Sequence, residues 1–315
     1  MGTTSKIIGT LATAIDKVSG VAISGLANIV GQIISLFTDD KAVAKSITTG
    51  TGQAVYITDS DGDYTFDHDD PFTVSFWIKV GWDANLNTTV HLFASADAGA
   101  GSANNDSFRI WYTENNNRLF TEWRHNQSHK AQQFWVFHNN SGVYADAYAA
   151  AGLGTTYWNS SNRGNANSDG YTLITFTRGT ANTAAPSNLK LYWNGTDCVD
   201  GYYSSANGKS DGNNVGTPAM SQNDKQVTLC SQAWGSFTQS GNNDETKFNG
   251  VTIWDRVLTA GEVTELYNSG TPMNVANHSA YSDCVGWWKF EDNGNNEISG
   301  GPAFTVNGNS NFEDK

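Results

Sequence analysis

The sequence predicts an all-β sandwich preceded by a short apolar, partly helical arm. The chain has fifteen Phe, twelve Tyr and eleven Trp against only three Met, and aromatic side chains favour pleated strands. From Ser46 onward, short alternating runs are separated by clusters of Gly, Asn, Ser and Asp, a pattern typical of strands joined by turns. A chain of 315 residues has room for one all-β domain of roughly 200–250 residues and an appendage.

Residues 1–45 are predicted to form the arm. Its apolar positions recur every three or four residues, the period of one helical face: Ile7, Leu11, Ile15, Val18, Leu26, Ile29 and Ile33. Glycines at positions 9, 20, 25 and 31 each weaken a helix by roughly 1 kcal/mol relative to Ala. The segment therefore needs a partner surface to hold its shape. We interpret it as an assembly arm, and the alternative is a helix that folds back on its own sandwich.

Residues 46–315 are predicted to form the sandwich, with short strands that begin and end at turn residues. They are Ala54–Thr58, Phe72–Val80, Val90–Ala94, Ser107–Thr113, Arg118–Arg124, Gln133–His138, Thr172–Arg178, Leu189–Trp193, Gln226–Cys230, Lys247–Trp254 and Val285–Phe290.

The run Phe72–Val80 is the clearest of these strands. Its residues 72, 74, 76 and 78 are apolar and alternate with more polar ones, so one face of the strand points into a core. Trp77 lies on the other face. We expect it to meet either a second apolar layer or a ligand.

One short helix is expected after Leu258. Thr259 and Glu262 have the spacing of a capping box, in which the hydroxyl and the carboxylate each bond a free backbone N–H at the helix start. Val263, Leu266 and Tyr267 then form an apolar stripe. A glycine commonly ends a helix, so Gly270 predicts its end.

Three segments, taken together, resemble the concanavalin-A-like lectin and glucanase superfamily, especially its laminin-G-like branch. They are the strand Phe72–Lys79; the pair Tyr171–Arg178 and Leu189–Thr196 with its Tyr-x-Asn-Gly turn; and Phe248–Val263 followed by Leu266–Gly270. The resemblance implies a jelly-roll β-sandwich. One feature departs from the family: Gly286–Asp292 resembles a strand that many relatives carry before the sandwich, whereas here it comes at the end.

The segment Ile15–Ala22 before a laminin-G-like domain also resembles virion proteins of tailed bacteriophages, particularly marine ones. This resemblance implies a virion structural protein, either a capsid decoration or a tail or fibre component, exposed on a particle assembled in the host cytoplasm. Its partners would be other virion proteins and copies of itself. The alternative function is a carbohydrate-binding adhesin that recognises host-surface glycans.

No catalytic residues are predicted. The glucanase signature Glu-x-Asp-x-x-Glu is absent from the sequence, as are a nucleophile elbow, an HExxH motif and a dinucleotide fingerprint. The formal net charge of −13 disfavours nucleic acid as a partner, because the phosphate backbone would be repelled. No run of about 18 apolar residues, the length of a membrane helix, occurs in the sequence.

An acidic loop is the best candidate for a metal site. Asp59, Asp61, Asp63 and Asp67 place several oxygens within a short span, and Ca²⁺ prefers six to eight oxygen ligands. The loop departs from an EF-hand at its sixth position, where Tyr64 replaces glycine. We interpret it either as a calcium site or as a solvated acidic loop.

Tryptophans on the strands and loops are candidates for stacking against sugar rings. Those considered are Trp111, Trp123, Trp135, Trp158 and Trp234, of which Trp123 and Trp158 are the predicted glycan-binding residues. The alternative is that these rings pack in the core, where strand aromatics commonly lie.

Overall fold

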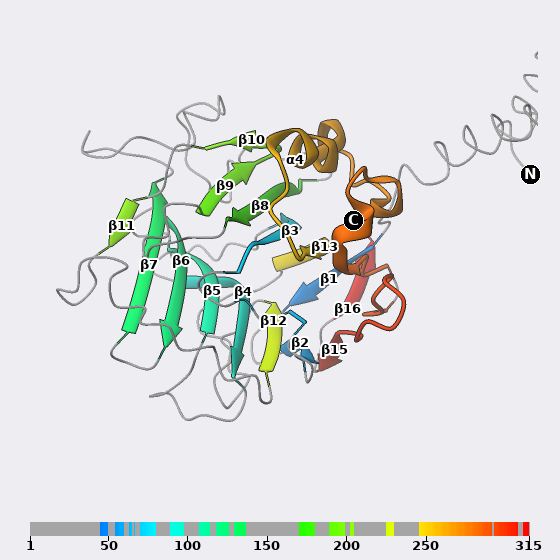
Figure 1. Cartoon of the computed structure of the whole chain (residues 1–315). Coiled ribbons are helices and arrows are strands. Elements are labelled where there is room, and N and C mark those ends of the chain that lie inside the picture. Colours follow the sequence, from blue (N-terminus) through cyan, green and yellow to red (C-terminus); the bar gives the residue numbers. More distant parts are fainter. Residues whose placement is uncertain are drawn as a thin grey trace, which may run out of the picture.

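The computed structural model describes residues 45–49, 54–59, 63–64, 66, 70–79, 89–97, 107–113, 118–125, 129–136, 170–179, 189–198, 202–204, 225–229, 246–291, 293–307 and 311–314. These residues form two antiparallel sheets that pack face to face (Figure 1). The all-β sandwich predicted from the sequence is confirmed. Among the described helices, none is long and apolar enough to cross a membrane.

The first sheet is eight-stranded as described, in the order β10-β9-β8-β3-β13-β1-β16, with β14 also paired to β13. Its strands are β10 (Thr196–Asp197), β9 (Leu189–Trp193), β8 (Thr172–Arg178), β3 (Phe72–Lys79), β13 (Thr246–Trp254), β1 (Lys45–Thr49), β16 (Asn311–Asp314) and β14 (Cys284–Trp288).

The second sheet, also eight-stranded over the same ranges, has the order β11-β7-β6-β5-β4-β12-β2-β15. Its strands are β11 (Tyr202–Ser204), β7 (His129–Val136), β6 (Arg118–His125), β5 (Ser107–Thr113), β4 (Thr89–Asp97), β12 (Lys225–Leu229), β2 (Ala54–Asp59) and β15 (Thr305–Asn307).

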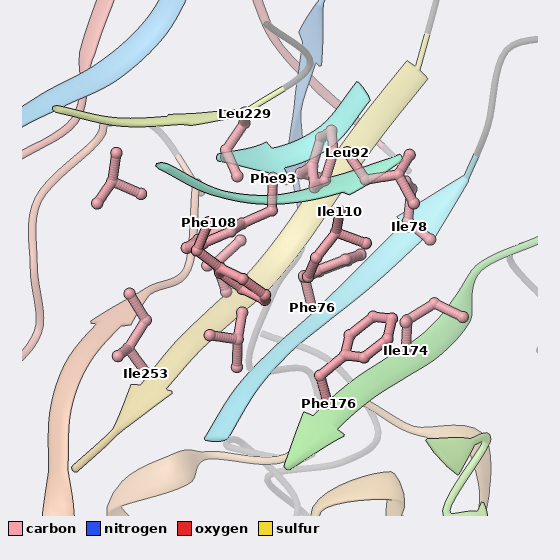
Figure 2. Packing of buried hydrophobic residues seen from close by; sticks show 14 of the residues in the cluster. Phe76, Ile78, Leu92, Phe93, Phe108, Ile110, Ile174, Phe176, Leu229 and Ile253 are labelled. Carbon is pink, nitrogen blue, oxygen red and sulfur yellow. The ribbon is translucent and has the colours of Figure 1, made fainter. Parts of the chain in front are cut away.

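The main core lies between the two sheets. Because side chains alternate along a strand, described residues at alternate positions of both sheets enter it; Phe76 of β3, Ile174 of β8 and Phe108 of β5 are fully buried there (Figure 2). The predicted inward face of Phe72–Lys79 is confirmed, since its residues 72, 74, 76 and 78 all belong to this core.

A second apolar layer covers the outer face of the first sheet. It joins side chains of β3, β8, β9 and β13 to those of helix α4 (Ala260–Tyr267). Trp77 belongs to this layer: it is buried, and its ring stacks on Tyr267 with centroids 5.9 Å apart. Of the two environments expected for Trp77, the structure therefore has the apolar layer.

The capping box of α4 is confirmed. The Thr259 hydroxyl accepts a bond from Glu262 N, and Glu262 Oε2 accepts one from Thr259 N at 2.8 Å. The helix ends at Tyr267, three residues before the predicted stop signal Gly270. Asn268, in the left-handed region at φ 45°, caps α4, and Gly270 ends a following 3₁₀ turn, Asn268–Gly270.

Most predicted strands occur, and three match to the residue: β5, β8 and β9. The other eight predicted strands differ from the structure at one or both ends; β4, for example, runs over Thr89–Asp97 and not Val90–Ala94. β7 runs over His129–Val136 and not Gln133–His138, and β14 ends at Trp288 and not at Phe290, whose φ of 60° is incompatible with a strand. The strands β1, β10, β11, β15 and β16 were not predicted. They are short and pair at or near the sheet edges. Such strands have few residues in which an apolar–polar alternation could be recognised.

β1 and β14 share one edge of β13. β1 pairs with its first part, Phe248 opposite Ile47, and β14 with its second part, Val251 opposite Trp288. Gly250, with φ 54°, lies between the two parts. The late strand that departs from the family pattern therefore completes the first sheet beside β1.

The first described strand begins where the predicted arm ends. Lys45 lies opposite Asp314 of β16. Residues 1–44, including all predicted arm residues, lie outside the described part of the chain. The arm and its boundary with the sandwich stay predictions.

Candidate functional site

The outer face of the second sheet carries the candidate site. On β5, Phe108 and Ile110 point into the core (Figure 2). Because neighbouring residues of a strand face opposite ways, Arg109 and Trp111 lie on the outer face. Phe120 of β6 is opposite Trp111 in the register and lies on the same face.

Trp111 and Phe120 form a stacked pair. Their rings are nearly parallel, with an interplanar angle of 3° and centroids 5.1 Å apart. Trp111 is 9% exposed, whereas Phe120 is only partly buried. The buried Trp111 ring therefore supports the more exposed Phe120 ring, which is held in a fixed orientation on the sheet.

Arg109 lies beside this pair. Its guanidinium carbon is 5.5 Å from the centroid of the Trp111 ring, a distance at which the cation is attracted to the ring face. The residue is buried, and its neighbours in the register are Ala94 of β4 and Glu122 of β6. Its place next to the ring combines a planar cation with a flat apolar surface.

Strand register places further residues of the sheet in line with Trp111 and with Arg109. We define the aromatic rung as the row of positions that lie opposite one another from strand to strand across β4, β5, β6, β7 and β11. They are His91, Trp111, Phe120, Phe134 and Tyr202. The polar rung, two residues away on each strand, is Arg109, Glu122, Gln132 and Ser204. With strands about 4.8 Å apart, the aromatic rung spans about 14 Å from β5 to β11.

The described side chains of this face, Trp111, Phe120 and Arg109, suit binding of a polyhydroxylated ligand. Aromatic rings offer flat surfaces for the C–H faces of sugars, and arginine offers hydrogen-bond donors for hydroxyls.

The two predicted glycan-binding residues do not coincide with this pair. Trp123 lies on β6 opposite Phe108, which puts it on a different rung from Phe120. The Trp123 side chain and the whole of Trp158 lie outside the described part of the chain, so both assignments stay predictions. Trp111 was among the tryptophans considered. Phe120 was missed, because the run Leu119, Phe120 and Thr121 has no apolar–polar alternation that marks Phe120 as outward-facing.

The acidic loop is described only in part. Asp59 is buried, and its Oδ2 accepts a 2.9 Å hydrogen bond from Tyr64 N. This carboxylate therefore bonds a backbone N–H of its own loop. Asp63 is exposed, and Asp61 and Asp67 lie outside the described residues. Within the described ranges, no three His, Cys, Asp or Glu side chains are grouped so as to hold a metal ion. Calcium binding stays a prediction.

Tyr64 ties the acidic loop to the C-terminal part of the chain. Its hydroxyl donates to Val285 O and accepts from Asn296 Nδ2, both at 3.1 Å. Burial, together with the charges of Asp63 and Asp59, raises the pKa of the Tyr64 phenol to about 12. The phenol is therefore a neutral structural group.

The described cysteines have no features of a nucleophile. Cys198 and Cys284 are buried free thiols. Burial raises the pKa of both, that of Cys284 to about 12, and the thiolate is the reactive form. Both act as small apolar groups in the packing.

No protein-family model matches this sequence, and no curated protein matches it either. Among solved structures, the chain is similar to "Ruminococcus gnavus IT-sialidase CBM40 bound to alpha2,3 sialyllactose", at 12% identity over 70% of this chain and 96% of that one, with a TM-score of 0.41.

Two further similarities are with parts of longer chains. One is the "Binding domain of Botulinum neurotoxin DC in complex with rat synaptotagmin II", at 15% identity over 69% of this chain and 40% of that one, with a TM-score of 0.38. The other is a leech intramolecular trans-sialidase complexed with 2,7-anhydro-Neu5Ac, at 12% identity over 73% of this chain and 29% of that one, with a TM-score of 0.39. The β-sandwich assignment itself rests on the two sheets of this chain.

Proposed function

We propose that this sandwich is a non-catalytic carbohydrate-binding domain that uses the outer face of β4–β7 and β11. The observation that carries the proposal is the stacked Trp111–Phe120 pair beside Arg109. Strand aromatics are usually expected in a core, but this pair lies on the face turned away from the core. A supported, partly exposed ring next to polar groups is the arrangement that sugar stacking requires.

The direct test is binding of the full chain to a glycan array, followed by titration calorimetry with the glycans that bind. Phe120→Ala should weaken binding about tenfold or more, because the stacking surface is lost. Phe120→Tyr should retain affinity, since a flat ring remains.

Tyr56→Ala is the matched control. Tyr56 is a partly buried aromatic residue of β2 in the same sheet, and two strands, β12 and β4, separate it from β5. Its loss should leave glycan affinity unchanged. Equal affinity of Phe120→Ala and the unmodified chain would contradict the proposal, as would the absence of binding to any glycan.

The virion role is a second proposal, supported by the apolar, glycine-interrupted sequence of residues 1–45. In this proposal the arm docks into a capsid or tail, and the sandwich displays its glycan-binding face. Mass spectrometry of purified particles tests it. High copy number supports capsid decoration, a few copies support a tail or fibre role, and absence from particles rejects it.

A further inference from the structure

Three Asn-Gly pairs of the chain lie at residues that the structure describes, with asparagines at positions 194, 249 and 293. A glycine has no side chain to shield its backbone nitrogen, so this nitrogen can attack the amide carbon of the preceding asparagine. The attack converts the amide to an acid. Its rate depends on whether the nitrogen and the carbon are held close together and on access of water. The three pairs differ in both respects.

Asn194 is held away from this reaction. It is 7% exposed, and its Oδ1 accepts a 3.0 Å hydrogen bond from Leu173 N of the neighbouring strand β8. Its own N–H donates to Leu173 O at 2.9 Å. Both the side chain and the main chain of Asn194 are therefore fixed to β8, and the amide carbon cannot turn toward Gly195 N without breaking these bonds.

Asn249 is protected by its burial. It is fully buried on β13, where it lies opposite Trp77 of β3, which is buried as well. Side chains of an extended strand stand out from the backbone, so the amide does not fold back over the following peptide. Water, which the conversion consumes, does not reach this position.

Asn293 has neither kind of protection. It is exposed, in the connection between β14 and β15. Its Oδ1 accepts a 2.8 Å hydrogen bond from Asn295 N, the bond of an Asx turn. This bond folds the side chain back over the peptide that joins Asn293 to Gly294. The amide carbon is thus held close to Gly294 N and does not extend into the solvent.

The same bond favours the chemistry. When a nitrogen attacks an amide carbon, negative charge develops on the amide oxygen, and a backbone N–H placed at that oxygen stabilises the charge. For Asn293 this donor is Asn295 N–H, within the same turn as the attacking nitrogen. For Asn194 the donor belongs to another strand, and its bond holds the amide away from the nitrogen.

We propose that Asn293 is a site of spontaneous deamidation in the folded protein. Gly294 N loses its proton to hydroxide and forms a bond to Cγ of Asn293. The Cγ–Nδ2 bond breaks, and the amide nitrogen leaves as ammonia after taking a proton from water, which regenerates the hydroxide. The product is a five-membered succinimide. Water then opens the ring at one of its two carbonyl carbons, which gives isoaspartate or aspartate.

The conversion would disturb a close contact beside the site. Gly294 O accepts a 2.7 Å hydrogen bond from Phe304 N, and a Cβ added to Gly294 would clash with Phe304 O. Phe304 packs edge-on against Trp288 and Phe290, with ring centroids 5.0 and 5.4 Å away. Isoaspartate adds one carbon to the main chain, and the contact with Phe304 leaves no room for the resulting shift. Conversion should therefore lower the melting temperature.

The experiment incubates the full chain at mildly alkaline pH, once folded and once in denaturant, and follows each Asn-Gly pair by peptide mass spectrometry. In the folded chain, acid at position 293 should form at least about tenfold faster than at positions 194 and 249. In denaturant the three rates should be similar, because each asparagine precedes a glycine. Electron-transfer fragmentation distinguishes isoaspartate from aspartate.

Asn293→Ser is the matched variant. Its hydroxyl can accept the bond from Asn295 N but cannot form a succinimide, so its melting temperature before incubation should be close to that of the unmodified chain. After incubation of both folded proteins, the melting temperature of the unmodified chain should fall and that of the variant should be kept.

Two results of the mapping would overturn the proposal. One is an equal rate at the three positions of the folded chain; the other is the absence of acid at position 293 while the denatured chain reacts. Neither depends on how the variant folds. An equal fall in melting temperature in Asn293→Ser would contradict the effect of the conversion on the contact with Phe304.

Discussion

Arg256 holds Glu262 through two hydrogen bonds, from Nη1 to Oε2 at 3.0 Å and from Nη2 to Oε1 at 2.7 Å. Arg256 follows β13, and Glu262 lies in the first turn of α4. The same carboxylate accepts from Thr259 N at the helix cap. This bidentate pair therefore fixes the start of α4 relative to the strand that precedes it.

The pair predicts a pH dependence of stability. The hydrogen bonds from Arg256 lower the pKa of Glu262 from 4.5 to about 2. A pKa that is lower in the folded than in the unfolded state adds stability above the unfolded value, and this contribution is lost as pH falls from about 4.5 through about 2. Urea titrations at several pH values measure the free energy of unfolding over that window.

Glu262→Gln should remove this pH-dependent contribution and cost about 1–3 kcal/mol at neutral pH, as loss of a charge-assisted bond does. Glu265→Gln is the control, because Glu265 lies on the same helix and bonds Ser279, not Arg256. An unchanged pH profile in Glu262→Gln would show that the pair does not stabilise the fold.

Thr73 joins the edge of the core to the start of α4. Its hydroxyl donates to Arg256 O at 2.8 Å and accepts from Leu258 N at 2.9 Å. Thr73→Val should cost about 1–3 kcal/mol, because it leaves a buried donor and acceptor unsatisfied. Thr73→Ser keeps the hydroxyl and should recover most of this loss in chemical denaturation. Equal stability of the two variants would contradict the role of the hydroxyl.

Gly195 is required by the turn between β9 and β10. Its φ is 79°, following Asn194 at 50°, and positive φ at both positions is typical of a type I′ hairpin turn. An added Cβ would lie 2.9 Å from Tyr267 Cβ. Gly195→Ala should therefore lower the free energy of unfolding by about 1–3 kcal/mol.

Gly261 provides the matched control for that substitution. A Cβ at this position meets no atom closer than Thr259 Oγ1 at 3.9 Å, and alanine favours a helix over glycine. Gly261→Ala should leave stability unchanged or raise it, as thermal unfolding would show. Equal losses in both alanine variants would mean that the turn does not depend on Gly195.

The pairing of β1 predicts how N-terminal deletions affect the stability of the sandwich. It lies between β13 and β16, with Ile47 paired to Phe248 on one side and Phe312 on the other. Deletion of residues 1–49 removes these ladder bonds and should destabilise the sandwich, because backbone groups of β13 and β16 lose their partners. Deletion of residues 1–44 leaves β1 intact and should change the melting temperature little.

The two deletions also test the arm. If residues 1–44 fold back on the sandwich, their removal lowers the melting temperature as removal of a packed helix would. If they dock elsewhere, stability is kept and assembly is lost. The comparison of melting temperature with incorporation into particles separates these alternatives.

Much of the sandwich could be predicted from the sequence. β5, β8 and β9 were predicted to the residue, because their apolar alternation and their bounding turn residues are both local features. The same holds for the capping box, since Thr259 and Glu262 satisfy backbone groups only three residues apart. Asn268 was missed as the cap because the prediction relied on glycine. Asparagine can also adopt the left-handed conformation that glycine favours.

The sequence by itself determined which residues alternate and therefore which strands have a buried face. It did not determine which strand lies beside which. The stacked pair of Trp111 and Phe120 exists only because β5 and β6 are neighbours in a fixed register. A shift of one residue between strands would move each of these side chains to the other face. The packing of the two sheets sets that register, so only the tertiary structure decided where the candidate site lies.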